Sequence, residues 1–387
     1  MKYNFDEIID RTGTDCVKWD YYREFLKEDD LLPLWVADSD FECPPKVKEA
    51  IVSRASHGIY GYSSPPDSYY DSILNWTETR YNWKIKRDWL SYSPGIVTAL
   101  NILVQALTKP GEKIVVQSPV YYPFFKAIEN NDRVLINNQL LLKKGKYEID
   151  FENLEHQIDF ETKMIFFCSP HNPVGRVWSE DELIKLGKIA EKHDLIIISD
   201  DIHSDIIYGD NKYVPISSLS EKLAMRTVTC IAPSKTFNIA GLESSSIIIP
   251  NPQIMTKYKR AMGNLGLHAP NMFAFVGLEA AYRYGQDWLD QLLKYLEQNV
   301  EFVDSFLKKN MPEVSIIEPE GTFLLWINFE KLGLPHQELK DLIYKKARVG
   351  LSDGISFGAG GEQFMRINIG CPKSTIQTAL ERIIKAL

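Results

Sequence analysis

Five short runs of almost entirely apolar residues divide the middle of the chain, and they constrain the fold more than any other feature. They cover residues 113–117, 164–169, 195–200, 227–232 and 244–250. A strand with one face in water alternates apolar and polar side chains, whereas strands buried on both faces do not. Helical stretches such as residues 179–193 separate several of the runs. The pattern predicts an α/β domain with a mostly parallel sheet flanked by helices.

The remaining third of the chain predicts a smaller α+β domain. Residues 287–310 carry apolar side chains at helical spacing over a length that can join two domains. Strands are expected at 314–318, 323–328 and 364–369, and helices at 336–346 and 373–386. We therefore expect an N-terminal segment (1–46) that packs with the small domain, a large domain (47–286) that holds the cofactor proposed below, and a small C-terminal domain (287–387).

Composition excludes several functional classes. The formal net charge of −8 argues against nucleic acid, because phosphate binding needs clustered Lys and Arg. The five cysteines are scattered without metal-ligand spacing, so neither a metal site nor disulfides are expected, and a reducing cytoplasm fits this usage. The chain opens on no signal peptide and has no run of about 18 apolar residues, so no membrane association is expected.

Polar residues follow three of the apolar runs, at the points where the strands are expected to end. They are Asn172, Asp200 and Lys235, in that order along the chain. Ligands of open α/β sheets bind at the carboxyl ends of strands, where these three residues would meet. A lysine amine forms a Schiff base with an aldehyde, a carboxylate keeps a pyridine nitrogen protonated, and an amide donates to a ring hydroxyl. The set predicts a site for an aldehyde cofactor with a pyridinium ring, although each residue alone is a common loop, cap or turn residue.

Longer motifs around these residues resemble a known family over nearly the whole length. The chain resembles fold-type I pyridoxal-phosphate enzymes of the aminotransferase superfamily, and within them the cystathionine β-lyase (C–S lyase) branch that includes the MalY and PatB proteins and cystalysin. The strings that carry the resemblance include VKWD (17–20), WVADSDF (35–41), HGIYGY (57–62), SPVYYPFF (118–125), SPHNPVGRVW (169–178), SDDIHSD (199–205), APSKTFNIAGL (232–242) and FMRINIGCP (364–372).

The resemblance implies roles for the residues around the cofactor ring. Lys235 matches the residue that binds the cofactor covalently and moves the substrate α-proton, Asp200 the pyridinium partner, and Asn172 the donor to the ring hydroxyl. His203 lies near the position of a tyrosine that approaches this hydroxyl in many relatives; a structural histidine is the alternative. Tyr121 matches the aromatic residue that stacks on the ring; a core tyrosine is the alternative.

The resemblance also implies where phosphate and substrate bind. Gly95, Ile96 and Val97 open a helix whose free N–H groups favour phosphate, unless they form a plain turn. Ser234 is expected to add a hydroxyl, and Tyr62 to reach across a homodimer interface into the neighbouring site. The remaining expected substrate residues are Arg366, which grips the α-carboxylate, the backbone at Ala37, Tyr62 again, and Tyr122, which faces the substrate with a catalytic role.

Three positions depart from relatives. Glu243 stands eight residues after Lys235, where many aminotransferases have a phosphate-binding arginine. Asp201 replaces a usual Glu, and Ala232 replaces a phosphate-binding serine. An ionised Glu243 cannot bind phosphate, so the phosphate would depend on backbone N–H groups, Ser234 and Tyr62.

The resemblance implies a cytoplasmic, homodimeric lyase that depends on pyridoxal 5'-phosphate. The expected reaction is α,β-elimination, which cleaves L-cystathionine or L-cysteine-type substrates to thiol, pyruvate and ammonia. The sequence leaves the choice of sulfur-containing amino acid open. Two alternatives also stay open: an aminotransferase on the same fold, and a protein that acts mainly by binding a transcription regulator, as some members of this branch do.

Overall fold

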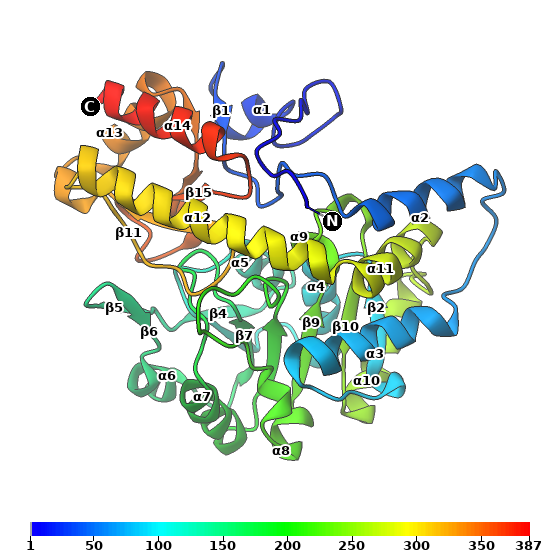
Figure 1. Cartoon of the computed structure of the whole chain (residues 1–387). Helices are drawn as coiled ribbons and strands as arrows, with labels where there is room; N and C mark the ends of the chain where they lie inside the picture. Colours follow the sequence, from blue (N-terminus) through cyan, green and yellow to red (C-terminus); the bar gives the residue numbers. More distant parts are fainter. Residues whose placement is uncertain (1) are drawn as a thin grey trace.

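The computed structural model describes residues 2–387, and its larger sheet has seven strands in the order β2-β10-β9-β8-β7-β3-β4 (Figure 1). Strand β10 runs antiparallel to β2 and β9, whereas β3, β4, β7, β8 and β9 pair in parallel. The prediction of a mostly parallel sheet built from the five apolar runs is confirmed. The strands are β2 Leu90–Ser93, β3 Lys113–Val116, β4 Val134–Asn137, β7 Thr162–Cys168, β8 Ile196–Asp200, β9 Thr227–Ile231 and β10 Ser245–Ile248.

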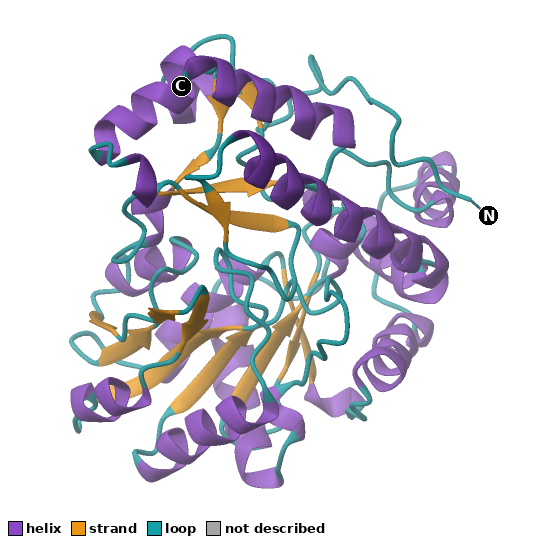
Figure 2. Cartoon of the chain, turned by 60° about the vertical axis from the view of Figure 1, so that its left-hand side comes forward, coloured by secondary structure: helices purple, strands orange, loops and turns teal. Residues whose placement is uncertain are grey.

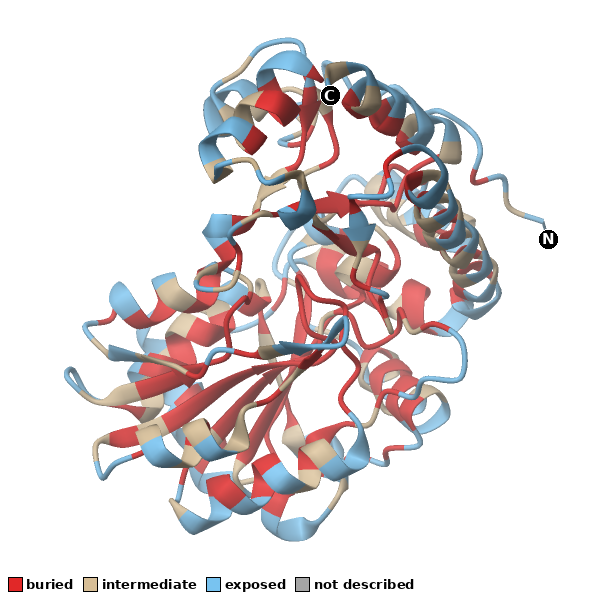
Figure 3. Ribbon diagram, turned by 90° about the vertical axis from the view of Figure 1, so that its left-hand side faces the viewer, coloured by how far each residue is buried: buried red, intermediate tan, exposed pale blue. Residues whose placement is uncertain are grey.

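Helices cover both faces of this sheet because its strands are apolar on both sides (Figures 2 and 3). On one face, Phe166 and Cys168 of β7 share a core cluster with α4, α5 and α10. On the other, Ile165 and Phe167 share a cluster with α6, α7 and α8. This alternation follows from the two-residue period of a strand. The helices are α4 Ile96–Leu107, α5 Pro123–Glu129, α6 Phe151–Gln157, α7 Glu180–Lys192, α8 Glu221–Ala224 and α10 Pro252–Asn264.

A third group of helices lies beside the sheet. Helix α11 (Met272–Tyr284) packs on α2 (Pro45–Ser56) and α3 (Asp67–Tyr81). Helices α10 and α11 are not among the predicted elements, although their N-caps, Asn251 and Asn271, each accept a hydrogen bond from a first-turn N–H. Those two asparagines are the local signal that would have predicted both helices.

The smaller sheet has the order β11-β12-β15-β14, and the long helix α12 (Gln286–Asn310) runs along the molecule beside both sheets (Figure 1). The helix predicted over 336–346 is an α-helix only as far as Asp341 and continues as a π-helical turn, Leu342–Lys346. One core cluster includes residues of α3, α11, α12 and β12, so apolar packing continues across residue 286, and the domain boundaries stay a prediction. The remaining elements are α13 His336–Asp341, α14 Lys373–Ala386, β11 Ser315–Ile316, β12 Leu324–Asn328, β14 Ser352–Asp353 and β15 Phe364–Asn368.

The chain near Leu34 lies beside the smaller sheet, where the backbone N–H of Asn368 in β15 donates to the Leu34 oxygen. A short helix, α1 (Tyr22–Leu26), precedes β1 (Leu32–Pro33), which pairs in parallel with β13 (Val349–Gly350). Strands β5 (Leu141–Lys143) and β6 (Lys146–Glu148) form a separate hairpin. None of the helices within residues 2–387 has the length and apolar character needed to span a bilayer.

Candidate active site

A cavity of about 270 Å³ lies at the carboxyl ends of β7, β8 and β9. Its volume is near the lower end of small-molecule sites, which hold roughly 300–1,000 Å³. Segments from six parts of the chain converge on it, as the rule for open α/β sheets predicts. The structure therefore brings together these expected residues: Ala37, Gly95, Ile96, Val97, Tyr121, Asn172, Asp200, His203, Ser234 and Lys235.

Asp200 is the last residue of β8 and forms part of the cavity's floor. Cα pairing places it in register with Cys168 of β7 and Cys230 of β9, so the three side chains share the sheet face covered by α4. Burial raises the pKa of the Asp200 carboxyl to about 7, while the Ile202 N–H and the Lys235 charge act in the opposite direction. A buried carboxyl with so little positive charge around it suits a cationic ring nitrogen.

Lys235 lies in the short helix α9 (Pro233–Thr236), which follows β9. Its Nζ donates to the backbone oxygen of Ala37 at 2.6 Å. Burial lowers the pKa of this amine; the charge of Asp38 raises it, that of Arg366 lowers it, and that of Asp200 raises it. A lowered pKa leaves more of the amine neutral, which is the form that attacks an aldehyde or accepts a proton.

Arg366 lies outside the cavity's lining but is bonded to it. It is buried in β15, and its guanidinium donates to Asn172 Oδ1 at 2.9 Å and to the Trp35 oxygen at 2.8 Å. The guanidinium also packs over the Phe357 ring, 4.9 Å from its centroid. Burial lowers the pKa of Arg366 to about 10, and its Nε has no hydrogen-bond partner among residues 2–387. A buried, incompletely paired arginine is ready to bind a carboxylate.

Asn172 and His203 supply polar atoms around the space above Asp200. Because Asn172 Oδ1 accepts from Arg366, its Nδ2 is the end that remains to donate to a cofactor. The His203 ring lies edge-on to Phe323, with centroids 5.7 Å apart, and its Nδ1 has no partner among the described residues. Burial, together with the charges of Lys235 and Arg366, lowers the pKa of His203 well below its usual range. These surroundings therefore favour the neutral form of the imidazole.

The opposite end of the cavity offers backbone donors and one acid. Helix α4 begins at Ile96 after Gly95, and its first N–H groups lie beside Ser234 in the lining. Such a helix start favours phosphate. Glu243, an exposed residue with a left-handed backbone (φ 54°), also lines the cavity. Burial followed by the Glu243 charge raises the pKa of Tyr92 to about 12. Glu243, which stands where many aminotransferases have a phosphate-binding arginine, therefore lines the cavity together with the start of α4.

Besides Arg366, two expected residues lie outside the lining. The Tyr122 ring is 5.4 Å from that of Tyr121, which lines the cavity, and 49% of Tyr122 is exposed. Tyr62 is fully exposed, in the extended segment between α2 and α3. The roles of both tyrosines remain predictions, as do the individual roles of the lining residues.

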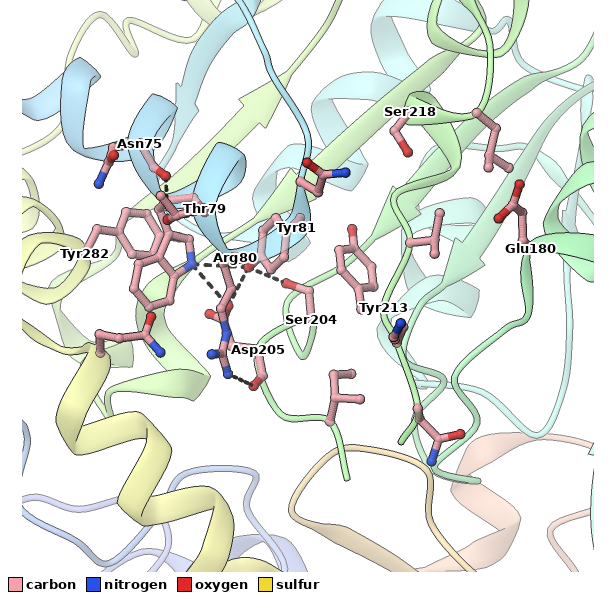
Figure 4. A pocket seen from close by; sticks show the side chains of 18 of the residues that line it. Asn75, Thr79, Arg80, Tyr81, Glu180, Ser204, Asp205, Tyr213, Ser218 and Tyr282 are labelled. Atoms are coloured by element: carbon pink, nitrogen blue, oxygen red, sulfur yellow. Dashed lines mark hydrogen bonds between the residues drawn. The ribbon is translucent and has the colours of Figure 1, made fainter. Parts of the chain in front are cut away.

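The sequence analysis missed a network of hydrogen bonds around the buried carboxylate of Asp205. Asp205 accepts hydrogen bonds from Tyr81 OH at 2.6 Å, Trp76 Nε1 at 3.1 Å and Thr236 Oγ1 at 2.8 Å. Figure 4 shows Asp205, Tyr81 and Ser204 on the wall of an open hollow of about 1,090 Å³. Thr236 directly follows Lys235, so this network anchors the helix that carries the lysine. Asp205 ends the string SDDIHSD, but its partners are too distant in sequence to be predicted.

The carboxylate of the neighbouring Asp201 also accepts hydrogen bonds. It accepts from Ser199 Oγ at 2.5 Å and from Tyr213 OH, and burial raises its pKa to about 7. Its carboxyl therefore faces partners of its own rather than the lining of the cavity.

Comparisons with known proteins agree with this geometry. The chain matches the aminotransferase class I and II family over residues 29–383. Cystathionine β-lyase PatB of Bacillus subtilis (strain 168) is 44% identical over 99% of this chain and 100% of its own length. A PLP-bound putative aminotransferase from Clostridium difficile 630 has a TM-score of 0.98 at 44% identity over 100% of both chains. Cystalysin from Treponema denticola, which contains pyridoxal 5'-phosphate, has a TM-score of 0.97 at 38% identity over 100% of this chain and 99% of its own.

The fold and site define a fold-type I enzyme that depends on pyridoxal 5'-phosphate. The residues that line the cavity fit this cofactor. They provide an aldehyde-reactive amine, a buried carboxyl without a full counter-charge, an amide donor and the start of a helix. The chain belongs to the aminotransferase class I and II family, and the expected recognition is confirmed.

Proposed function

We propose that the protein is a pyridoxal-phosphate-dependent carbon–sulfur β-lyase that cleaves L-cystathionine or L-cysteine-type substrates to thiol, pyruvate and ammonia. The observation that carries this proposal is that Lys235 lines the cavity above Asp200, while Arg366 donates a hydrogen bond to Asn172, another residue of the lining. The similarity to the PatB cystathionine β-lyase over almost the full length supports the choice of reaction.

The residues divide the chemistry among them. When bound, pyridoxal phosphate supplies an electron sink for the pair released at the substrate Cα. Arg366 binds the substrate α-carboxylate in a two-point contact and so fixes the direction of the Cα–H bond. Lys235 Nζ takes the proton from Cα, and its lowered pKa keeps it able to accept that proton. Asp200 holds a proton at the ring nitrogen, and the Cβ–S bond of the substrate then breaks as the thiolate leaves.

An aminotransferase on the same fold is the second candidate, because a structure with a TM-score of 0.98 to this chain is described as a putative aminotransferase. Product analysis separates the two. Purified enzyme with L-cystathionine, and no keto acid, is expected to release pyruvate, ammonia and thiol in equal amounts over many turnovers. A strict requirement for a keto acid, with no thiol released, would reject the lyase and support the aminotransferase.

We also propose that the protein is a cytoplasmic homodimer in which Tyr62 completes the partner's site. Three large side chains close together in the sequence, Ile59, Tyr60 and Tyr62, are exposed in the single chain, and five free cysteines suit a reducing compartment. Cell fractionation tests the location.

Mixing two inactive variants tests the dimer. Chains carrying Lys235→Ala and chains carrying Tyr62→Ala, refolded together, are expected to regain activity. Each mixed dimer would have one site with an intact lysine from one chain and an intact tyrosine from the other. If the mixture stays as inactive as its components, Tyr62 does not act across the interface.

A further inference from the structure

Residues 35–41, which we call the strap, lie between β1 and α2 and touch both sides of the active site. The Trp35 oxygen accepts from Arg366 at 2.8 Å, and the Ala37 oxygen accepts from Lys235 Nζ at 2.6 Å. The two side chains expected to handle the substrate are thus both held by carbonyl groups of one short segment. Its backbone position is therefore one determinant of where both of them point.

The side-chain amides of two asparagines also hold the strap. Asn368, from β15, donates to the oxygens of Val36 and Asp38, each at 2.6 Å. Asn238, three residues after Lys235, donates to the oxygens of Ser39 and Phe41 at 3.0 and 2.8 Å. The charged side chains of the strap, Asp38 and Asp40, take no part in these four bonds, all of which end on backbone oxygens.

Those charges belong to a compact group that we call the strap cluster: Arg11, Lys18, Asp38 and Asp40. Arg11 contacts both Asp38 oxygens, at 3.2 and 2.8 Å, and Asp40 Oδ1 at 2.7 Å. Lys18 is fully buried, and its Nζ lies 2.8 Å from Asp40 Oδ2 and 3.9 Å from Asp38 Oδ1. An ion network this well enclosed holds its geometry more firmly than an exposed pair.

We propose that the strap cluster is a positioning device of the active site: it fixes the strap so that its carbonyls aim Lys235 and Arg366. The side chains of Arg11 and Lys18 come from the part of the N-terminal segment that precedes the strap, and none of the described residues there lines the cavity. All four residues of the strap cluster are thus positioning residues, and this gives that part of the chain a function.

The cluster also acts on Lys235 through charge. Asp38 is next in sequence to Ala37, whose oxygen holds the lysine, and the Asp38 charge raises the pKa of the Lys235 amine. The other groups that face Lys235 are Asp200, which acts in the same direction, and Arg366 and the neutral His203. Arg11 and Lys18 offset part of the Asp38 charge from its far side. Removing Asp38 and removing Arg11 should therefore shift the proton affinity at Lys235 in opposite directions.

An absorbance titration of the enzyme loaded with pyridoxal 5'-phosphate tests this. The visible band changes when the nitrogen shared by cofactor and Lys235 gains a proton. The midpoint pH is expected to fall by about half a unit to one unit in Asp38→Asn and to rise by a similar amount in Arg11→Gln. The measurement needs bound cofactor but no lyase activity, so its failure is distinct from failure of the proposed function.

Two further variants keep the test decisive. Arg11→Lys retains the charge but not the two-point contact, so it should keep the wild-type midpoint while the KM for the amino-acid substrate rises about threefold to tenfold. Arg23→Gln removes an exposed ion pair with Asp29 in the same N-terminal segment and should change neither quantity. Midpoints that shift together in Asp38→Asn and Arg11→Gln, or that do not shift, would overturn the proposal, as would a KM unchanged in Arg11→Lys.

Discussion

Replacing Lys235 with alanine is expected to abolish pyruvate and thiol production from L-cystathionine, with turnover reduced about 10⁴-fold or more. The variant loses the amine that reacts with the cofactor aldehyde and also the base at Cα, and each function alone contributes several orders of magnitude. The visible absorbance that marks covalently held cofactor should disappear as well. Coupled assays for pyruvate and free thiol, together with a spectrum of the purified variant, measure both effects.

Lys188→Ala is a suitable control, because Lys188 is an exposed lysine on α7, outside the cavity. Its activity and spectrum should match those of the unchanged enzyme. Turnover preserved in Lys235→Ala would refute the proposed mechanism, since none of the other residues that line the cavity carries an amine.

The second large effect is expected at Arg366. In Arg366→Lys the charge remains but the planar two-point contact with the substrate α-carboxylate is lost, as are the bonds to Asn172 and the Trp35 oxygen. Weakening a buried, hydrogen-bonded charge pair commonly removes about 2–4 kcal/mol, so kcat/KM should fall roughly 30- to 1,000-fold. Most of the change should appear in KM, because the arginine contacts the substrate before and during the reaction.

Steady-state kinetics with L-cystathionine measure this change, and Arg382→Lys, on the exposed side of α14, is its matched control. Cofactor absorbance should be retained in both variants. A drop in kcat at constant KM would contradict carboxylate binding by Arg366 and would assign it to the chemical step instead.

Much of the fold was predictable because local signals were strong. Helix α14 has the predicted bounds, and α4 begins at Ile96, where a helix was expected to open, since each begins directly after a Pro or Gly. Helix α7 begins directly after Ser179, the first residue of the predicted helical stretch, and Ser179 and Glu182 form a capping box. Helices α10 and α11 were missed although asparagine caps mark both, and the π-helical turn after Asp341 has no signal in the residue pattern.

Some features of the site were likewise predictable from the sequence, and others were not. Asn172, Asp200 and Lys235 were predictable because the ends of parallel strands meet at one edge, so their order alone brings them together. The Lys235–Ala37 bond joins residues 198 positions apart, and Asp205 reaches Trp76 across 129. Such contacts depend on how whole segments pack, which the residue pattern does not encode locally.

The central claim is that Lys235 holds pyridoxal 5'-phosphate covalently beside Asp200, and borohydride reduction tests it most directly. The purified enzyme is incubated with the cofactor, reduced, digested and analysed by mass spectrometry. The account predicts a phosphopyridoxyl group on the peptide that contains Lys235 and none on any other lysine. Label located elsewhere, or an unmodified Lys235 peptide in fully loaded enzyme, would contradict it.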